Sequence, residues 1–562
     1  MQARQRLTRL FAAMLLLVAA AVPAAERPPG AAIATAHPMA TQAAREILEQ
    51  GGNAFDAAVA VTASLAVVEP YSSGIGGGGF WLLHRADDGH QVMVDGRETA
   101  PGEAHSWMYL DADGEPVSGA SLNGPLAAGI PGTPAALAHI TEQYGHLSLS
   151  QNLAPAIRQA RHGFPVDRHY RRLMGFRKDA VSEWPDAARI FLLDGEIPRE
   201  GHLIRQPDLA RTLERIAEQG HAGFYHGELA EKLVRSTRDA GGIWQLEDFA
   251  DYAIVERDPV IIDYRDMRIT AASLPSAGGV ALGTMFGLLA EHDLDSLDRV
   301  TRIHLIAETM RRAYRDRSLF LGDPDFIEDP TAQLTGEDHL RLLASDLDLE
   351  RATDSGDLPA PRQRGEDTTH FSIIDADGNR VAATLSINYP FGSGFVAAGT
   401  GVLLNNEMDD FATRPGEPNA YGLIGGEPNL VEPGKRPLSS MTPAFIETDD
   451  RIGILGSPGG SRIITQVMLG ILAFAEGESA ATWVSRPRYH HQYAPDRIQH
   501  EPGAFDLHTI RALEALGHSV ESAGRQYGDM QAVLWHRGEN RLEAASDPRG
   551  GGEAIVLSRE QH

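Results

Sequence analysis

A threonine at position 368 stands where a polar segment gives way to a strand pattern. The segment before it, residues 351 to 367, contains prolines and charges without apolar periodicity, which predicts an exposed flexible loop. If the chain is cut between Asp367 and Thr368, Thr368 gains a free α-amine beside its own hydroxyl. Such an amine has a pKa near ~7.7–8, close to what a general base needs at neutral pH. A hydroxyl with a built-in base is the N-terminal form of a threonine nucleophile.

The residues after Thr368 predict a β-hairpin that holds polar groups beside it. "HFSIIDADGNRVAATLSI" has the pattern of strand, turn and strand. If residues 375 to 379 form the loop, Thr368 falls opposite Ser386, and an error of one residue still leaves Asn388 close by. On residue type alone a simple strand start is the stronger interpretation, because threonine is β-branched and common in strands.

Helices and strands are mixed along the rest of the chain. Residues 40 to 70 predict two helices broken at residues 51 to 53, and the second helix is apolar on nearly all sides and hence buried. Residues 300 to 324 predict another long helix, and residues 451 to 474 predict a strand, a glycine loop and a helix. Because a hairpin occurs among them, the sheets cannot be all parallel.

The composition excludes several classes of function. The chain has 562 residues, 42% of them hydrophobic, which is enough for a substantial core. A formal net charge of -27 argues against nucleic acid or an anionic membrane as the main partner. Without any cysteine the chain has no disulfides, no thiolate metal sites and no cysteine nucleophile.

The N-terminus has the pattern of a secretory signal. Arginines precede an apolar run from Leu10 to Val22, and small residues follow it. We expect residues 1–24 to be removed, by cleavage after Ala24 or Ala25, and the product to be periplasmic or secreted. A membrane anchor is the weaker interpretation, since the run is shorter than the ~20 apolar residues of a span. No later stretch is long and apolar enough to span a membrane.

Two tempting motifs do not fit their usual roles. Gly74, Gly76 and Gly79 satisfy G-x-G-x-x-G, but a helix pattern precedes them and a strand pattern follows, the reverse of a dinucleotide site. We expect a tight loop with close backbone packing there. His490 and His491 are adjacent, so on a strand they face opposite ways and make a poor metal pair. We expect them to be structural.

Several motifs, in order along nearly the whole chain behind the signal, resemble the γ-glutamyltransferase (γ-glutamyl transpeptidase) family. The ones in the last third are "TTHFSIIDADGNRVAATLSIN", "FGSG", "GVLLNNEMDDF", "KRPLSSMTP" and "GSPGGSRIITQV". The ones nearer the N-terminus are "GGNAFDAAVAV", "GIGGGGF", "DGRETAP", "GIPGTPAAL" and "AETMRRAYRDRSLFLGDPDF".

The resemblance implies a fold of mixed α/β (α+β) class, the αββα four-layer sandwich of N-terminal nucleophile hydrolases. It also implies a zymogen that cleaves itself between Asp367 and Thr368. The products would be a large subunit, residues 25–367, and a small subunit, residues 368–562, which together form one αββα unit as a heterodimer. On this interpretation the strand pattern begins at Thr368 because a separate polypeptide begins there.

The resemblance further implies which residues bind a γ-glutamyl head group. The α-carboxylate of that group requires a guanidinium and hydroxyls, and its α-ammonium requires acceptors. The positions that match the family's carboxylate binders are Arg97, Ser439 and Ser440. The positions that match those near the ammonium are Asn388, Glu407 and Asp410. Glu407 stands where some members have glutamine.

Four more residues match positions at the reacting centre or above it. Ser386 stands where other members have threonine, and either hydroxyl can support the Thr368 nucleophile. Gly459 and Gly460 precede a helix expected to start near Ser461, where backbone N–H groups can stabilise an oxyanion. "RPGEPNAYGLIGGEPN" resembles the family's substrate lid, with Tyr421 as its gate.

The expected activity is therefore γ-glutamyl transfer and glutathione hydrolysis. The Oγ atom of Thr368 attacks the γ-carbonyl of glutathione or another γ-glutamyl compound, and a γ-glutamyl ester forms as the amine leaves. Water then gives hydrolysis, and an amino acid or dipeptide acceptor gives transfer. The mechanism requires no metal and no cofactor.

Two alternatives remain open at this point. A cephalosporin or glutaryl acylase shares the fold and the nucleophile, but Arg97, Asp410 and the two serines favour an amino-acid head group over a plain diacid. A non-catalytic secreted relative that keeps the fold would remain one intact chain.

Overall fold

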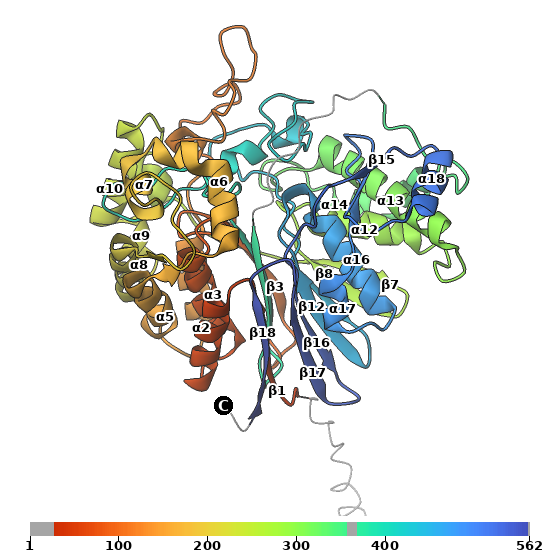
Figure 1. Cartoon of the computed structure of the whole chain (residues 1–562), viewed down its shortest axis with the longest axis horizontal. Coiled ribbons are helices and arrows are strands. Elements are labelled where there is room, and N and C mark those ends of the chain that lie inside the picture. The colour runs from red at the N-terminus through yellow and green to blue at the C-terminus, as the bar shows by residue number, and fades with distance from the viewer. Residues whose placement is uncertain (1–26, 357–367, 560–562) are drawn as a thin grey trace, which may run out of the picture.

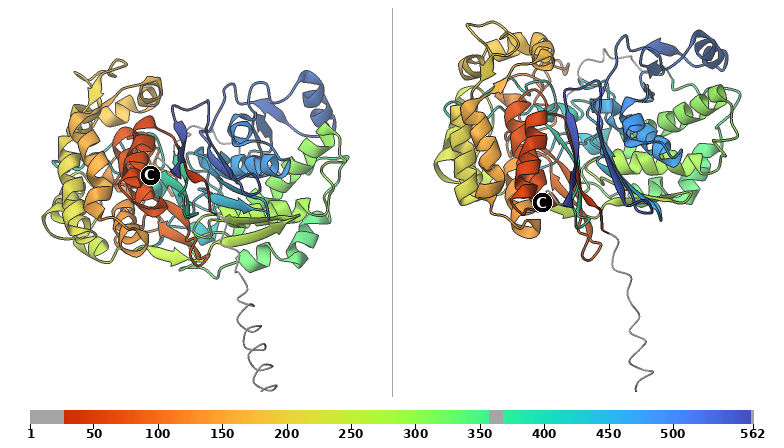
Figure 2. Two further views of the ribbon diagram at one scale, coloured as in Figure 1. Left: turned by 90° about the horizontal axis from the view of Figure 1, so that it is seen from below. Right: turned by 60° about the horizontal axis from the view of Figure 1, so that its bottom comes forward.

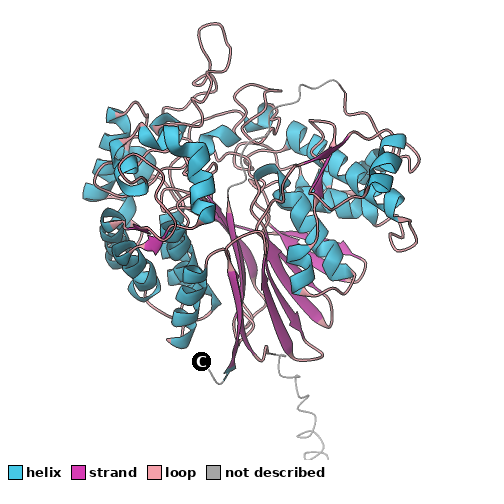
Figure 3. Ribbon diagram, in the orientation of Figure 1, coloured by secondary structure: helices cyan, strands magenta, loops and turns pink. Residues whose placement is uncertain are grey.

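Two β-sheets lie face to face at the centre of the computed structural model, which describes residues 27–356 and 368–559. One group of helices covers the outer face of each sheet, on the left and on the right in Figures 1 and 3. The layers are helix, sheet, sheet and helix, which confirms the expected αββα class. The expected signal, most of the expected loop before Thr368, and Asp367 itself lie outside the described residues.

The first sheet has seven antiparallel strands in the order β18, β1, β9, β10, β2, β3, β6. Their bounds are Glu553–Ser558 (β18), Gly30–Thr35 (β1), Thr369–Ile374 (β9), Arg380–Ser386 (β10), Gly78–His84 (β2), Gln91–Gly96 (β3) and Val255–Arg257 (β6). The C-terminal strand β18 runs beside β1, so both ends of the described chain meet at one edge (Figure 2). Strands from before and after Thr368 are thus interleaved.

The second sheet has six antiparallel strands in the order β17, β16, β12, β11, β8, β7. Their bounds are Arg541–Ser546 (β17), Gln531–His536 (β16), Arg451–Gly456 (β12), Ala444–Glu447 (β11), Met267–Ala271 (β8) and Val260–Tyr264 (β7). Two small sheets lie outside this sandwich. They contain Tyr489–His490 (β13), Ile498–His500 (β14) and Val520–Ser522 (β15), and Phe164–Pro165 (β4) with Leu203–Ile204 (β5).

The helices divide between the two outer layers. The layer on the first sheet contains Pro38–Glu49 (α2), Ala54–Val68 (α3), Thr133–Tyr144 (α4), Leu149–His162 (α5), Arg168–Ser182 (α6), Pro185–Phe191 (α7), Pro207–Gln219 (α8), Ala222–Tyr225 (α9), Gly227–Asp239 (α10) and Leu246–Ala250 (α11). The other contains Gly278–Leu289 (α12), Arg299–Phe320 (α13), Thr331–Leu334 (α14), Glu337–Ala344 (α15), Ile463–Ala475 (α16), Ala480–Ser485 (α17) and Leu507–Ala515 (α18). Short 3-10 turns are Pro125–Ala127 (η1), Glu407–Asp410 (η2), Glu427–Asn429 (η3) and Gly460–Arg462 (η4).

The first sheet is apolar on both faces because it is an inner layer. In β1, Ala31 and Ile33 belong to the core shared with the first helical layer, whereas Ala32 and Ala34 belong to the core between the sheets. Neighbouring residues of a strand point to opposite faces, so this alternation gives each face its own core. The strands β9 and β10 lie near the centre of this sheet, and both pack against β12 of the second sheet.

The local elements expected from the sequence are confirmed. α2 and α3 are separated by residues 50 to 53, and Asn53 caps α3 with a reciprocal bond to Asp56. Every residue of α3 is buried, as its apolar pattern indicates. The long helix α13 begins after Asp298, whose side chain accepts from Val300 N, and ends before Gly322.

The hairpin register is also confirmed. In the β9–β10 pair, Ile374 lies opposite Arg380 and Thr369 lies opposite Leu385. One further step along the same register sets Thr368 opposite Ser386. The register of the hairpin therefore places Thr368, without any contact to the second sheet.

The two motifs set aside in the sequence behave as expected. α3 precedes Gly76 and β2 follows it, and a Cβ at Gly76 would lie 2.1 Å from the carbonyl oxygen of Leu403, so the glycines permit close backbone packing. His490 bonds to Thr465 and Gln492, and His491 bonds to Asp496, so both histidines are satisfied inside the protein. Within residues 27–356 and 368–559, no helix is long and apolar enough to cross a membrane.

Candidate functional site

A pocket at the ends of the central strands brings together most of the predicted site residues. It is lined by Arg97, Thr368, Ser386, Asn388, Asp410, Tyr421, Ser439, Ser440 and Gly460, together with the apolar residues Leu423, Met441 and Ile463. Glu407 lies directly behind this wall, against Arg97, and Gly459 is the neighbour of Gly460 outside it. Among these residues only Ser386 lies within a strand, β10, and the others lie at strand ends, in loops and at the start of α16, so only the folded chain gathers them.

Thr368 lies on the floor of this pocket, at the start of β9. It is 6% exposed, which keeps its hydroxyl largely out of bulk water. Thr368 also lines a second cavity, together with Glu69 and Asp529. Burial raises the pKa of Glu69 to about 7, and the pKa of Asp529 well above its usual range.

The chain turns sharply after β10, and this turn presents Ser386 and Asn388 to the pocket. The backbone N–H of Asn388 donates to Ser386 Oγ at 2.8 Å, and Asn388 Nδ2 donates to Asn406 O at 2.9 Å. Asn388 has a φ of 70°, in the left-handed region that asparagine tolerates better than most residues. The asparagine is thus suited to this turn as well as to any ligand contact.

Arg97 follows β3 and is held almost completely buried by carboxylates. Its Nη1 atom lies 2.7 Å from Glu407 Oε2, and its Nη2 atom lies 2.5 Å from Asp410 Oδ2. Its Nε–H donates to Pro437 O at 3.1 Å. Glu407 and Asp410 are the ends of the 3-10 turn η2, in which side chains three residues apart share a face, so one turn supplies both partners.

Burial shifts the pKa values of the carboxyl groups around Arg97. Burial raises the pKa of Glu407 to about 7, while the Arg97 guanidinium pulls it down and Asp410 pushes it up. Burial and the neighbouring Glu407 hold the pKa of Glu98 well above its usual range. Asp410 is 13% exposed and faces the pocket. The cluster therefore offers one guanidinium beside one accessible carboxylate.

The serines lie on the loop that leads into β11. Ser439 N donates to Pro275 O at 2.8 Å, and Ser439 Oγ accepts from Met441 N at 3.1 Å, so this part of the loop is fixed. The buried Ser440 Oγ has no hydrogen-bond partner among the described residues. A buried hydroxyl without a partner is costly, and a ligand oxygen in the pocket would satisfy it.

Gly459 and Gly460 form the loop between β12 and α16. Their φ angles are 136° and 55°, so side chains at either position would be strained. The helix expected to start near Ser461 begins as the 3-10 turn η4, and α16 proper starts at Ile463. A Cβ at Gly460 would lie 2.3 Å from a ring carbon of Tyr421, so the glycine is required for the ring to pack over the pocket.

Tyr421 closes the pocket from above. Its hydroxyl donates to Asn388 O, and its side chain is 4% exposed. The segment around it is held by Asn419 Nδ2, which donates to Asp410 Oδ1 at 3.1 Å, and by Gln492 Nε2, which donates to Gly422 O at 3.0 Å. The free volume left below is about 20 Å³, close to the room that one water needs.

Sequence reasoning missed several residues that build the site. The side chain of Asn405 makes four hydrogen bonds: it donates to Gly76 O and Gly129 O and accepts from Gly129 N and Glu407 N, so it joins η2 to the loops that precede β2 and α4. Its neighbour Asn406 orients Asn388. Both asparagines lie inside the motif "GVLLNNEMDDF". The motif does not show which residues they bond to, so their role could not be predicted from it. The apolar lining residue Met441 gave no signal of its own.

One group of potential metal ligands occurs among the described residues, and none of its members lines this pocket. It consists of His304, Glu308 and His518, all buried. Glu308 is already engaged by Arg311 at 3.1 Å and Arg312 at 2.5 Å. Two guanidiniums on the only carboxylate repel a cation, so the cluster is structural.

The αββα fold, with a buried threonine at the start of a central strand, is that of the N-terminal nucleophile hydrolases, and this protein is of that class. A family model described as gamma-glutamyltranspeptidase matches residues 40–557, and the chain belongs to this family.

Two named proteins are similar to this chain over most of its length. The glutathione hydrolase proenzyme of Escherichia coli (strain K12) is 39% identical over 526 residues, which cover 92% of this chain and 90% of that protein. The glutathione hydrolase proenzyme of Pseudomonas aeruginosa is 40% identical over 540 residues, which cover 94% of this chain and 95% of that protein.

Solved structures show the same architecture. The cephalosporin acylase from Bacillus halodurans has a TM-score of 0.83 at 28% identity, covering 95% of this chain and 96% of its own. A chain of the γ-glutamyltranspeptidase of Helicobacter pylori has a TM-score of 0.55 at 36% identity, and covers 58% of this chain but 96% of its own length.

Proposed function

We propose that this protein is a γ-glutamyltransferase and glutathione hydrolase with Thr368 as its nucleophile. The observation that carries the proposal is the combination, in one closed pocket, of a buried Thr368 with the Arg97–Asp410 pair. A γ-glutamyl group has a zwitterionic end and a reacting amide several bonds away, and the pocket has a matching polar end and nucleophile. The two curated relatives described above are glutathione hydrolase proenzymes.

The polar end of the pocket offers both signs of partner that the head group requires. The substrate carboxylate would lie against Arg97 and the hydroxyls of Ser439 and Ser440, and would satisfy the unpartnered Ser440 Oγ. The substrate ammonium would lie against Asp410, the accessible carboxylate, with Asn388 and Glu407 as further acceptors. A plain diacid has no group to neutralise Asp410, which disfavours the acylase alternative.

The chemistry would follow from the order of groups along the pocket. The Thr368 α-amine takes the proton from its own hydroxyl as Oγ attacks the γ-carbonyl, with Ser386 on the opposite strand as a hydrogen-bond partner. The backbone N–H groups of Gly459 and Gly460 stabilise the oxyanion. The C–N bond of the amide then breaks, and the Thr368 ammonium returns its proton to the leaving amine. The resulting ester passes its γ-glutamyl group to water, or to an amino acid or dipeptide acceptor. Residues of this chain perform every step.

The proposed maturation cuts the chain between Asp367 and Thr368 into subunits of residues 25–367 and 368–562. Because β9 and β10 lie between β1 and β2 in one sheet, the two polypeptides would stay together through ladder hydrogen bonds on both sides. The Helicobacter pylori chain, which covers little more than half of this one, fits a family whose members have two polypeptides. Removal of residues 1–24 would place the heterodimer in the periplasm or the medium.

One assay tests the proposed function against the acylase alternative. We expect the purified protein to hydrolyse a γ-glutamyl anilide and to release the aniline faster when a dipeptide acceptor is added. The matched substrate is the glutaryl anilide, which lacks only the α-amino group. Faster turnover of the glutaryl compound would identify an acylase instead, and turnover of neither would favour a non-catalytic relative.

The closing segment gives a prediction about the fate of the ester. Tyr421→Ala removes the ring that covers the pocket and its bond to Asn388 O, so water reaches the ester more easily. We expect a larger share of hydrolysis over transfer, together with weaker discrimination against bulky substrates. The measurement is the ratio of free glutamate to γ-glutamyl dipeptide at one acceptor concentration.

Tyr421→Phe is the control, because it keeps the ring and removes only the hydroxyl. We expect its product ratio to lie between wild type and the alanine variant. An unchanged ratio and substrate range in Tyr421→Ala would show that residues 415 to 426 do not act as a lid.

The raised pKa of Glu407 gives a prediction about pH. A carboxyl with a pKa of about 7 is neutral below that value and charged above it, so the pocket gains a negative charge as the pH rises through 7. We expect the inhibition constant of the product glutamate to improve by about tenfold across this range, since a charged acceptor then meets the ammonium. The dependence should disappear in Glu407→Gln.

The Thr368 amine also titrates near this range, so the part of the pH dependence assigned to Glu407 is the part that Glu407→Gln removes. The control is Glu69→Gln, a second buried carboxyl with a raised pKa that lies in the cavity on the other side of Thr368. If Glu407→Gln keeps the wild-type pH profile, Glu407 does not contact the head group.

A further inference from the structure

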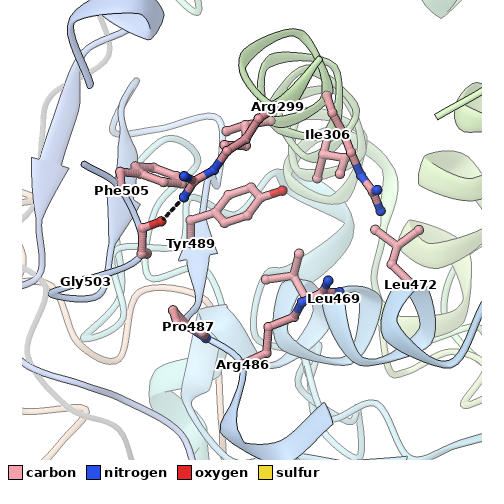
Figure 4. Close-up of a pocket in the computed structure, with 12 residues that line it drawn as sticks. Arg299, Ile306, Leu469, Leu472, Arg486, Pro487, Tyr489, Gly503 and Phe505 are labelled. Atoms are coloured by element: carbon pink, nitrogen blue, oxygen red, sulfur yellow. Dashed lines mark hydrogen bonds between the residues drawn. The ribbon is translucent and has the colours of Figure 1, made fainter. Parts of the chain in front are cut away.

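A cavity of about 350 Å³ lies between α13, α16 and the loop that follows β14 (Figure 4). It shares no lining residue with the pocket around Thr368. Its volume lies within the ~300–1,000 Å³ that small-molecule sites occupy, and is far above the 20 Å³ left beside Thr368. The cavity is therefore open to a ligand as it stands.

The inner wall of the cavity is apolar. Ile306 from α13 and Leu469 and Leu472 from α16 face one another across it, and Phe505 closes one side (Figure 4). Each of these side chains is less than a tenth exposed. Such a wall is suited to an alkyl or aryl group, which gains free energy by leaving water.

The charged residues among the lining are all arginines: Arg299, Arg302 and Arg486. The carboxylates that pair with them lie outside the wall. Arg302 and Arg486 share the partner Glu476, and Arg486 also lies 3.6 Å from Glu478. Arg299 lies 3.8 Å from Asp506 and donates to Ala504 O at 2.8 Å. A chain with a net charge of -27 thus gathers guanidiniums around an apolar cavity. Guanidiniums recognise carboxylates through paired hydrogen bonds.

Tyr489 adds a hydrogen-bond donor in the middle of the cavity. Its hydroxyl points into the open space in Figure 4. Burial raises the pKa of Tyr489, against the lowering effect of the three arginines, so the phenol keeps its proton. A partly buried phenol that faces a cavity can donate a hydrogen bond to a ligand oxygen.

We propose that this cavity binds a small amphipathic carboxylate, with its apolar body between α13 and α16 and its carboxylate among the guanidiniums of Arg302, Arg486 and Arg299. α13 precedes Thr368 in the sequence, and α16 and Tyr489 follow it. The ligand would therefore bridge the two segments on either side of that residue and stabilise their packing. The inference does not depend on the activity proposed for Thr368.

The test is isothermal titration of the purified protein with decanoate, below its micelle concentration, and with decyltrimethylammonium as the cation of equal chain length. We expect saturable binding of one decanoate per chain and no saturable binding of the cation. Absence of saturable decanoate binding would overturn the proposal. Equal binding of both compounds would also overturn it, because the arginines would then play no part.

Two variants locate the site. Arg302→Gln and Arg486→Gln should each weaken decanoate binding by about tenfold, the effect of losing one charged hydrogen-bond partner. The matched control is Arg189→Gln on α7, a paired surface arginine in the other helical layer. Affinities that stay at the wild-type value in both cavity variants, or fall equally in the control, contradict the assignment. If either variant melts early, the comparison of decanoate with its cationic counterpart on the wild-type protein still decides.

Discussion

Thr368→Ala is expected to leave the protein as one uncut polypeptide without γ-glutamyl hydrolase activity. In wild type we expect two polypeptides, the smaller one running from Thr368 to His562. The same hydroxyl must attack the Asp367 carbonyl during maturation and the substrate afterwards, so its loss removes both reactions. Loss of a nucleophile costs on the order of 10⁴-fold or more in rate. Denaturing gels with N-terminal sequencing, followed by the anilide assay, measure both effects.

The matched variant is Thr368→Ser, which keeps a hydroxyl and an α-amine in the same place. We expect it to mature, more slowly than wild type, and to retain measurable activity. A smaller polypeptide that begins at any residue other than 368 would refute the maturation site. An uncut but fully active Thr368→Ala protein would refute the role of Thr368 altogether.

The second large effect is expected at the polar end of the pocket. Arg97→Ala and Asp410→Ala should each leave maturation intact and reduce kcat/KM for γ-glutamyl substrates by roughly 30- to several-thousand-fold. The reason is that removing one partner of a buried, hydrogen-bonded charge costs on the order of 2–5 kcal/mol. Steady-state kinetics with the γ-glutamyl anilide measures the loss.

Arg257→Ala is the control for Arg97. Arg257 is also a largely buried arginine, paired with Asp95 at 2.8 Å on the neighbouring strand, but it does not line the pocket. Any loss through general destabilisation should appear in it as well, whereas loss of substrate contact should not. Near wild-type efficiency in Arg97→Ala or Asp410→Ala would mean that the head group binds elsewhere.

Much of the fold follows from local pattern. The break between α2 and α3 follows from two glycines and an asparagine that caps the second helix, and the apolar sequence of α3 specifies its burial. The β9–β10 register follows from the length of one turn, which is why Thr368 could be placed opposite Ser386 in advance. Such features depend on residues a few positions apart.

The electrostatics of the site are not local, and the sequence did not contain them in readable form. Arg97 and Asp410 are 313 positions apart, and their pairing depends on η2 packing against the end of β3. Glu407 matched an ammonium-binding position by resemblance, but its pKa of about 7 arises from complete burial beside Arg97. Burial is a property of the assembled layers, so no motif predicts it.

The sequence by itself determined the order of the elements and the set of residues that match the family's motifs, Thr368 among them. Only the tertiary structure decided that Tyr421 packs on Gly460 and leaves room for about one water, and that Ser440 Oγ stays unpartnered. It also decided that three arginines surround an apolar cavity between α13 and α16. The physical reason is the same in each case: side chains distant in sequence meet only when two sheets and their helices pack, and free volume, burial and charge pairing are set by that packing.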